Sequence, residues 1–235
     1  DKETEEKYQL HHYTKPIIQR GLFVNGSVVF NNDDFNELEE TLRPTRLLHI
    51  TNNSPISEKL QEYIAVGEEQ KIHERYKCAK RNKWYVIPNV ASRPEAFFFK
   101  RSHHYPKLLK NNSAAFVTDS AYKIEMKADY DLDSFIYSFY NTLTLVFSEI
   151  EGRYYGGGVL ELTPSEFKKL PIPYTAITEN QFQTFTTQFE KKQNIESILA
   201  QNDYTILNTS LGLNKTDLKK LTAIRNKLVK KRMRG

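Results

Sequence analysis

The sequence predicts an α+β fold, with a mixed or antiparallel sheet packed against a long core helix and a helical extension at the C-terminus. Two patterns predict it. Short aromatic and β-branched runs, separated by turn-forming residues, occupy much of the first half of the chain and are typical of strands. Apolar residues recur with helical spacing over residues 132–150 and again near the C-terminus. A chain of 235 residues with 39% hydrophobic content is long enough for one domain or two small ones.

The first elements follow from turn and capping residues. Residues 22–30 predict a hairpin, because the Asn-Gly pair at 25 and 26 tolerates the positive backbone angles of a two-residue turn. An aspartate at 33 or 34 can cap a short acidic helix that reaches residue 42, and Pro44 separates this helix from a strand over 46–50. Ser54 and the proline after it predict the start of another helix, which we expect to end at Gly67.

The central part of the chain predicts the sheet and its covering helix. Residues 83–88, 96–101 and 114–126 are rich in aromatic and β-branched side chains, so we expect three strands there. Over residues 132–150 the apolar side chains keep a period of about 3.6 residues, which indicates one long core helix.

The remainder is predicted to be helical. Thr163 and Pro164 open a short helix that ends before Pro171, and two longer helices follow, separated near Gly212. Three segments result from these elements. We expect a first segment over residues 1–54, an α/β domain over residues 55–178 and a helical C-terminal extension over residues 179–235.

Positive charge is concentrated in two stretches. The formal net charge is only +5, but residues 71–110 contain eleven Lys and Arg against two acidic residues, Glu74 and Glu95. Residues 215–235 contain nine bases against one acid, Asp217. Clustered cations are what a polyanion-binding surface needs, because each neutralised phosphate releases condensed counterions. We therefore expect a nucleic-acid partner.

Other function classes are disfavoured. No apolar run approaches the roughly 18 residues that span a bilayer, and the acidic start is unlike a signal peptide, so we expect no membrane association and a cytoplasmic location. The single Cys78 excludes an internal disulfide. Adjacent histidines at 11–12 and 103–104 lack a third ligand at a recognisable spacing, so no metal site is expected. A Glu-x-Lys match at 125–127 is isolated and does not support a nuclease site.

Three blocks of sequence carry a family resemblance. The first is residues 63–68 (YIAVGE) with 75–81 (RYKCAKR) and 84–85 (WY), and the second is 97–101 (FFFKR) with 105–106 (YP) and 111–112 (NN). The third is residues 149–158 (EIEGRYYGGG) with 170–173 (LPIP). Together these blocks resemble the C-terminal target-recognition region of adenine-specific DNA methyltransferases of bacterial restriction-modification systems. The resemblance covers roughly residues 55–235. It implies that residues 55–178 are the α/β target-recognition domain and that residues 1–54 are a linker or the edge of a preceding catalytic domain.

The resemblance implies a division of labour between two domains of one protein. In that family an N-terminal methyltransferase domain binds S-adenosylmethionine and holds the flipped adenine with an Asn/Asp-Pro-Pro-Tyr/Phe loop. This sequence has no Pro-Pro pair, and Gly156, Gly157 and Gly158 follow two tyrosines rather than opening a helix. The resemblance thus implies that this chain alone is not an enzyme, binds no cofactor, and reads double-stranded DNA beside a catalytic domain, with a restriction endonuclease as a further partner.

The candidate DNA-binding residues combine bases, amides, aromatic rings and glycines. Arg and Lys can contact phosphates or guanine, Asn can contact adenine, and a glycine turn lets backbone amides approach a phosphate or base edge. The set is Arg75, Tyr76, Lys77, Lys80, Arg81, Lys83, Lys100, Arg101, His103, Asn111, Arg153, Tyr154, Tyr155, Gly156, Gly157 and Gly158.

Each candidate has a plainer interpretation. The charges can be a solvated surface, and the glycines can be a flexible turn from a helix to a strand. Trp84 and Tyr85 are expected to be buried in the sheet rather than in contact with bases. In the last predicted helix, Leu218, Leu221, Ile224, Leu228 and Val229 share one face, which can dock on the body while the bases meet DNA, or the helix can simply be solvated. The alternative function is a protein-interaction or subunit-assembly domain of a DNA-modifying complex.

Overall fold

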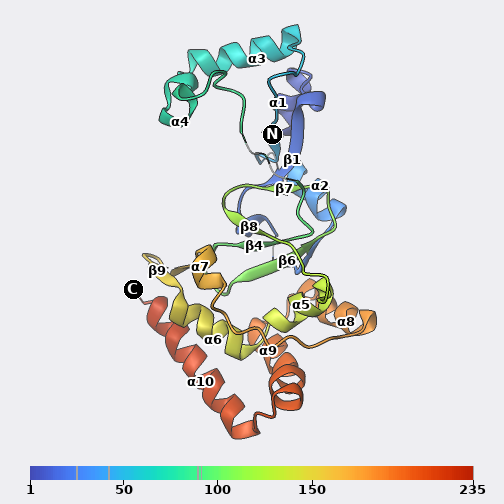
Figure 1. Cartoon of the computed structure of the whole chain (residues 1–235), viewed down its shortest axis with the longest axis vertical. Coiled ribbons are helices and arrows are strands. Elements are labelled where there is room, and N and C mark those ends of the chain that lie inside the picture. The colour runs from blue at the N-terminus through green and yellow to red at the C-terminus, as the bar shows by residue number, and fades with distance from the viewer. Residues whose placement is uncertain (25, 42, 89, 91, 235) are drawn as a thin grey trace. The chain divides into compact units, whose positions relative to one another are not determined.

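The computed structural model describes residues 1–24, 26–41, 43–88, 90 and 92–234 (Figure 1). The chain divides into two compact units that alternate along the sequence. Unit 1 comprises Asp1–Gln19, Asn32–Arg93 and Ser113–Thr118, and unit 2 comprises Arg20–Asn31, Pro94–Asn112 and Asp119–Gly235. Neither unit follows the boundaries predicted at residues 54 and 178. The mixture of helices and small sheets confirms the α+β fold class.

Unit 1 is built around a small mixed sheet. Strand β1 pairs antiparallel with β3 and parallel with β7, which gives the order β3-β1-β7. The described elements of unit 1 are α1 (Lys2–Lys7), η1 (His11–Tyr13), β1 (Thr14–Ile18), α2 (Asn32–Glu40), β3 (Arg46–Leu48), α3 (Glu58–Glu69), η3 (Ile72–Glu74), α4 (Tyr76–Ala79) and β7 (Phe116–Val117). Helix α2 and strand β3 confirm two predicted elements, although the predicted end of the helix at residue 42 lies outside the described residues. The predicted cap is wrong, because the helix begins at Asn32, and Asp33 and Asp34 lie in its first turn.

Helix α3 differs from its prediction at both ends. Ser57 is its N-cap and accepts a hydrogen bond from the Leu60 amide (3.2 Å), so the helix begins later than Ser54 suggested. Gly67 does not end the helix but lies within it. A Cβ at Gly67 would lie 2.4 Å from Cη2 of Trp84, so this glycine makes room for the indole ring rather than for a left-handed turn. Close packing against Trp84, which the spacing of residues in the sequence does not reveal, explains why the predicted helix end at Gly67 is wrong.

The strand predicted over residues 83–88 is wrong. This stretch forms turns, and its aromatic side chains pack against an apolar cluster made by Leu10, Ile50, Leu60 and Ile64. Trp84 donates from Nε1 to Glu68 Oε1 (3.2 Å), and its ring meets Tyr85 edge-on with centroids 5.8 Å apart. Both side chains are half-buried against this cluster, so the expectation that they pack rather than stand free is confirmed, but the expectation that they do so in the sheet is wrong.

Unit 2 contains two sheets. The four-stranded sheet has the order β2-β6-β4-β8, in which β2 and β6 are parallel and the other pairs antiparallel. The second sheet is antiparallel with the order β5-β10-β9. The strands are β2 (Val29–Phe30), β4 (Ala96–Phe99), β5 (Arg101–Ser102), β6 (Lys107–Asn111), β8 (Ala121–Ile124), β9 (Arg153–Tyr155) and β10 (Val159–Glu161). The predicted strands over 96–101 and 114–126 are confirmed in part.

The hairpin predicted over residues 22–30 is wrong. Gly21–Val24 forms a 3-10 helix (η2), and strand β2 pairs with β6 rather than with the residues before it. The predicted turn residue Asn25 lies outside the described residues. Apolar alternation alone could not distinguish a local partner from β6, which lies about eighty residues further along the chain.

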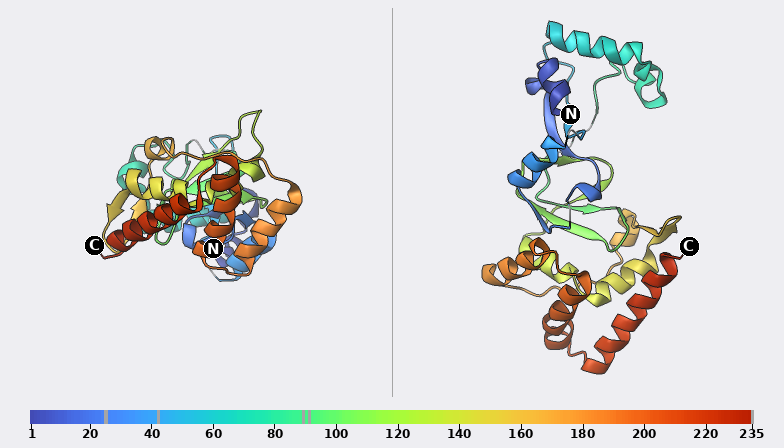
Figure 2. Two further views of the ribbon diagram at one scale, coloured as in Figure 1. Left: turned by 90° about the horizontal axis from the view of Figure 1, so that it is seen from below. Right: turned by 180° about the vertical axis from the view of Figure 1, so that it is seen from behind.

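Helices cover the four-stranded sheet of unit 2 (Figures 1 and 2). They pack onto it through one apolar cluster that includes Phe98, Leu108, Phe139, Phe185 and Leu199. The helical elements are α5 (Leu132–Phe139), α6 (Thr142–Glu151), α7 (Pro164–Phe167), α8 (Glu179–Glu190), α9 (Ile195–Asp203), the π-helical segment η4 (Tyr204–Ser210) and α10 (Lys215–Arg232). The C-terminal helices therefore share one core with the sheet.

The single long helix predicted over 132–150 is two helices. Asn141 interrupts it and caps α6, because its Oδ1 accepts from the Thr144 amide (2.9 Å). Asp203 of α9 accepts from the Thr142 amide (2.7 Å) and so satisfies another free N–H at the same helix start. The apolar period continues through the break because both helices bury the same side. The break predicted near Gly212 is confirmed, and a further break separates α8 from α9.

Candidate nucleic-acid interface

The three-stranded sheet of unit 2 brings two predicted arginines into one row. Glu161 of β10 lies opposite Arg101 of β5 on one side and opposite Arg153 of β9 on the other. Both arginines are well exposed, with 67% and 58% of their side chains accessible, whereas Glu161 is only 12% exposed. The row therefore presents one arginine on each side of a largely covered carboxylate. Arg101 and Arg153, which lie 52 positions apart in sequence, become neighbours across one strand.

Carboxylates hold both arginines through Nε. Arg101 donates from Nε to Glu161, and Arg153 donates from Nε to Glu166 Oε1 (2.7 Å). Glu166 also accepts from the Thr163 amide (2.8 Å), which makes it part of the capping box of α7. Burial acts to raise the pKa of Glu166, but the bonds from Thr163 and Arg153 outweigh it and hold the pKa below its ordinary value. Both of these bonds use Nε, and the terminal nitrogens of each guanidinium are additional hydrogen-bond donors.

Two tyrosines accompany the arginines. Tyr154 and Tyr155 are 43% and 45% exposed. The Arg101 guanidinium lies 5.6 Å from the centre of the Tyr155 ring, and the Tyr154 hydroxyl donates to the Glu149 carbonyl oxygen. Burial, with the nearby Glu149 charge, raises the pKa of Tyr154, so the hydroxyl stays a donor. The sheet thus offers ring faces beside its cations.

The three glycines form the turn between β9 and β10, and they have different surroundings. Gly157 and Gly158 both have φ of +74°, a conformation that favours glycine. No atom lies within 4 Å of where a Cβ would be at Gly156 or Gly157, whereas a Cβ at Gly158 would lie 2.8 Å from Met233 Sδ. Gly156 and Gly157 therefore face open space, and Gly158 is packed. The alternative interpretation of the glycines as a turn from a helix to a strand is wrong, because they join two antiparallel strands.

The remaining unit 2 candidates differ in accessibility. Exposed His103 donates from Nε2 to the Gly157 carbonyl oxygen (2.9 Å), so it supports the turn. Lys100 joins β4 to β5, is half-buried, and has its Nζ 5.7 Å from the centre of the Tyr122 ring. Asn111 is only 3% exposed, and its Nδ2 donates to the Pro94 carbonyl oxygen (2.9 Å). We therefore withdraw Asn111 from the candidate set, since a buried amide held by the backbone cannot reach a base.

The other candidates form a basic segment in unit 1. Around the four-residue helix α4, Arg75, Lys77 and Lys80 are exposed, and Tyr76 is 74% exposed. Lys80 donates to the Tyr76 hydroxyl (2.7 Å). Arg81 Nη1 donates to the Trp84 carbonyl oxygen (3.2 Å), and Lys83 Nζ to that of Asn52 (3.4 Å). Five of these six residues lie at the surface as predicted, and Arg81 is half-buried.

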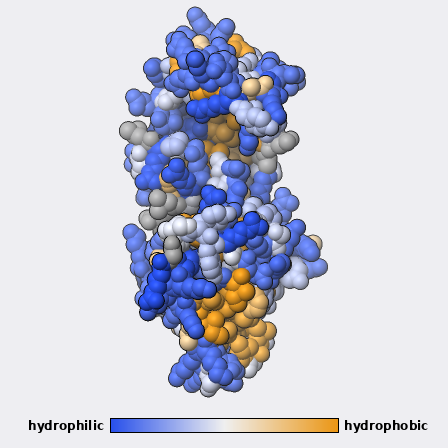
Figure 3. Space-filling model, turned by 90° about the vertical axis from the view of Figure 1, so that its left-hand side faces the viewer, coloured by the Kyte–Doolittle hydropathy of each residue, from blue (hydrophilic) through white to orange (hydrophobic). Residues whose placement is uncertain are grey.

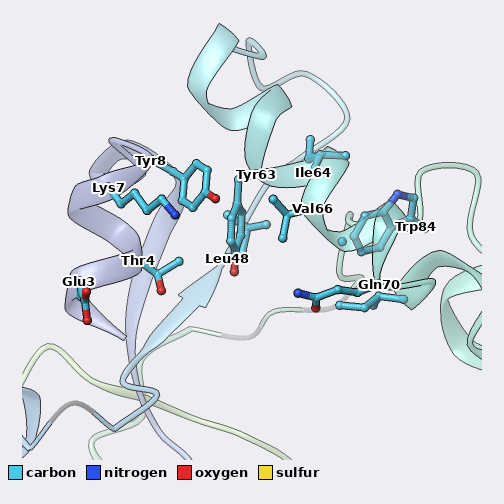
Figure 4. Close-up of a pocket in the computed structure, with 12 residues that line it drawn as sticks. Glu3, Thr4, Lys7, Tyr8, Leu48, Tyr63, Ile64, Val66, Gln70 and Trp84 are labelled. Carbon is cyan, nitrogen blue, oxygen red and sulfur yellow. The ribbon is translucent and has the colours of Figure 1, made fainter.

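A pocket of about 530 Å³ lies in unit 1 (Figure 4). Tyr8 of α1 and Tyr63 of α3 lie side by side on one part of its wall, with ring centres 5.1 Å apart. Gln70, the residue after α3, and Trp84, from the turns that follow α4, line another part of the wall. None of the predicted site residues lines this pocket.

The sequence did not single out the carboxylates Glu149, Glu161 and Glu166 or the base Arg232, all of which support the unit 2 sheet. Arg232, near the end of α10, is 3% exposed and forms a bidentate pair with Glu149 of α6 (Nε–Oε2 2.8 Å, Nη2–Oε1 2.8 Å). Arg232 follows buried Arg225 by seven residues and so lies on the same side of α10 as the apolar residues. This spacing is the sequence pattern that could have predicted its burial.

Two general findings concern the residues that the structure describes. Among them, no group of three or more His, Cys, Asp or Glu side chains is placed to hold a metal ion. No helix formed by them is both long and apolar enough to cross a membrane.

Comparison with known proteins identifies the family. The model of the C-terminal domain of the type II methyltransferase M.Eco57I matches residues 1–207. The chain belongs to this family. The predicted resemblance is thereby confirmed, and the match to the M.Eco57I C-terminal domain family also includes residues 1–54, which the sequence had left outside the resemblance. Helix α10 lies beyond the matched residues.

A solved structure shares the fold. The type IIG restriction endonuclease BpuSI aligns with 98% of this chain at a TM-score of 0.54 and 11% sequence identity. The chain spans 27% of the length of that protein. No curated protein matches the chain in sequence.

Proposed function

We propose that this chain is the target-recognition domain of an adenine-specific DNA methyltransferase of a bacterial restriction-modification system, and that it binds double-stranded DNA in a sequence-specific way. Membership of a methyltransferase C-terminal domain family supports the enzyme context. The observation that carries the DNA-binding part is the row Arg101–Glu161–Arg153 beside Tyr155 and the open glycines of the β9–β10 turn.

The row has the chemistry of base recognition. An arginine presents two parallel donors to the O6 and N7 acceptors of guanine, and this pairing discriminates bases only if the guanidinium is held in one orientation. Glu161 and Glu166 supply that orientation for Arg101 and Arg153. The open positions at Gly156 and Gly157 allow backbone N–H groups to approach a phosphate without side-chain obstruction.

The basic segment around α4 suits a different task. Among the described residues, no carboxylate is a hydrogen-bond partner of its exposed bases Arg75, Lys77, Lys80 and Lys83. The segment consists of one short helix and turns. Such bases serve phosphate contacts, which fix position on the duplex and carry no sequence information. We propose this role for them.

Methyl transfer belongs to another part of the protein in this proposal. The chain lacks the Asn/Asp-Pro-Pro-Tyr/Phe sequence, so S-adenosylmethionine and the flipped adenine are assigned to an N-terminal methyltransferase domain. A restriction endonuclease, fused or separate, is the expected companion of the activity. We expect these components to work in the cytoplasm.

The proposal is tested by selecting duplexes from a randomised DNA pool with this chain and then measuring affinity for the enriched duplex by fluorescence anisotropy across a salt series. We expect one short adenine-containing motif and an affinity that falls steeply with salt. Arg101→Ala and Arg153→Ala should each relax one position of the motif at a cost of about 1–3 kcal/mol. Lys191→Ala, which removes an exposed charge at the end of α8, is the matched control.

A glycine variant separates the turn from the arginines. Gly156→Val is preferred to a change at Gly157, because Gly157 has a positive φ that would strain any side chain. The Val side chain should fill the open space and abolish specific binding without altering thermal stability. Failure of the wild-type chain to bind any duplex at low salt contradicts the proposed function.

The competing function is protein assembly, and one surface favours it. Figure 3 shows a hydrophobic patch surrounded by hydrophilic residues on one face of the molecule. Unit 2 exposes Ile150 (55%), Ile224 (46%) and Met233 (40%). An assembly domain would bury such apolar area on a protein partner, and its affinity would depend little on salt.

A further inference from the structure

The end of α10 is attached to the candidate DNA-contact turn by one buried arginine. Beyond its bidentate pair with Glu149, Arg232 donates from Nη1 to the His103 carbonyl oxygen (2.6 Å) and to the Gly158 carbonyl oxygen. One guanidinium therefore joins α6, the segment after β5 and the last glycine of the β9–β10 turn. All of these residues lie in unit 2.

Burial of this ion pair has a cost in free energy, so stability alone does not explain its presence. Arg232 and Glu149 are each 3% exposed, and removing two charges from water costs several kcal/mol per ion before their attraction is counted. An apolar pair of similar volume would stabilise the helix packing at least as well. The additional bonds to two backbone carbonyls are what an apolar pair could not supply, and these bonds fix the position of the turn.

The packing around the turn agrees with this role. Gly158 has no Cβ, and Met233, the residue after Arg232, occupies that space with its sulfur. His103, whose carbonyl accepts from Arg232, donates from its ring to Gly157, so the turn is held on a second side. Tyr154 donates to the carbonyl of the same Glu149. The turn is thus braced by α6 and α10, while Gly156 and Gly157 face open space.

We propose that Arg232 is a positioning residue for DNA recognition: it holds the β9–β10 turn and the adjoining Tyr154 and Tyr155 in the shape that receives the duplex. This inference rests on the proposed function. It adds that α10, which lies outside the residues matched by the family model, contributes to affinity by ordering the turn in advance, since a loop fixed before binding loses less conformational entropy on binding.

The test compares a double variant with wild-type protein. Arg232→Met alone would leave Glu149 buried and unpaired, so the main variant is Glu149→Met with Arg232→Met, which keeps the volume and removes both charges. Arg232→Lys retains the charge but cannot reach both carboxylate oxygens and both carbonyls at once. Lys219→Met, at an exposed position earlier in α10, is the control.

Two measurements are made on each variant. Hydrogen exchange, followed by mass spectrometry, should become at least about tenfold faster in residues 153–161 of the double variant, while α5 and α6 stay protected. Affinity for the selected duplex should fall by at least about tenfold, with the slope of affinity against salt unchanged because no phosphate contact is lost. For Arg232→Lys, both the exchange rate and the affinity should lie between those of the double variant and wild type. Lys219→Met should have the exchange rate of wild type.

Each outcome either supports or overturns the positioning role of Arg232. Unchanged exchange over residues 153–161 overturns the positioning role, and so does faster exchange with unchanged affinity for the selected duplex. If wild-type protein binds no DNA, the proposed function fails, whereas the exchange result still shows whether Arg232 orders the turn.

Discussion

The Tyr140 hydroxyl donates to the Leu108 carbonyl oxygen (2.8 Å) and accepts from the Leu108 amide (3.1 Å), so one buried side chain satisfies both backbone groups of a residue in the central sheet. Tyr140 is 0% exposed and lies between α5 and α6. It therefore fixes the helix break against strand β6, which belongs to the same unit as the candidate interface.

Tyr140→Phe should destabilise unit 2 by about 2 kcal/mol or more. The phenylalanine keeps the apolar contacts but leaves the Leu108 N–H and C=O buried without this partner, and each unsatisfied group costs about 1–3 kcal/mol. Urea denaturation followed by circular dichroism measures the change. Tyr137→Phe, in the last turn of α5, is the control and should have a small effect. Equal losses of stability for the two variants would contradict the assignment.

Gly67→Ala should disturb unit 1 despite alanine's higher helix propensity. The new Cβ would meet the Trp84 ring at 2.4 Å, and overpacking of this kind typically costs about 1–3 kcal/mol. Trp84 is the single tryptophan of the chain, so its fluorescence emission reports the displacement directly. We expect emission at longer wavelength. Gly156→Ala, where the Cβ enters open space, should leave the spectrum unchanged.

Glu161→Gln should reduce sequence discrimination more than it reduces stability. The Arg101–Glu161 pair is exposed on the arginine side, so its loss should change the unfolding free energy by under about 1 kcal/mol. Without the carboxylate, Arg101 loses its fixed orientation, while the removed negative charge favours non-specific attraction to DNA. The ratio of affinities for selected and scrambled duplexes should therefore fall.

Glu151→Gln is the matched control for that experiment. Glu151 pairs with exposed Lys169 (2.9 Å) in a similar way, but neither residue belongs to the row of β5, β10 and β9. Its affinity ratio should equal that of wild type. A Glu161→Gln variant that retains the full ratio would show that the carboxylate does not orient Arg101 for recognition.

Asp203→Asn should reveal a pH-dependent contribution to stability. Burial is the largest influence on Asp203 and raises its pKa above the ordinary value of 3.8, although the bonds from Thr142 act in the opposite direction. Because the folded-state pKa is the higher one, stabilisation by proton binding is complete below about pH 3.8 and is lost as the pH rises through the raised pKa.

At pH 7 the unfolding free energy of the asparagine variant should therefore equal that of wild type or exceed it by up to about 1 kcal/mol. The reason is that the amide oxygen can still accept from Thr142, while no charge is buried. The difference should disappear as the pH approaches 4. Thermal melts at intervals between pH 4 and pH 7 measure it, and a variant that loses stability relative to wild type as the pH rises would have the wrong sign.

Local sequence signals predicted the elements that depend on neighbours in the chain. The Thr163–Pro164 start of α7, the acidic helix α2 and the strands around Phe98 follow from caps and side-chain periodicity, and all are present. The aromatic stretch at 83–88 was assigned to a strand, because apolar composition does not say whether a residue pairs with a strand or packs on a helix.

The same limit applies to the candidate interface. Arg153, Tyr154, Tyr155 and the glycines were indicated by their local sequence and the family resemblance, and they form strand β9 and the turn that follows it. The carboxylates that orient the arginines could not be recognised in this way. Arg101 and Glu161 are 60 residues apart, and Arg232 and Glu149 are 83 apart, so their pairing exists only after the strands and α10 are assembled.

The sequence by itself determined the α+β class, the clusters of basic residues and membership of a methyltransferase family, because composition, periodicity and motif order are properties of the chain. Only the tertiary structure decided that Asn111 is buried, that Gly67 accommodates Trp84, and that the glycine turn is held by Arg232. Burial and side-chain pairing depend on which distant segments meet, and close packing of the whole unit determines those contacts.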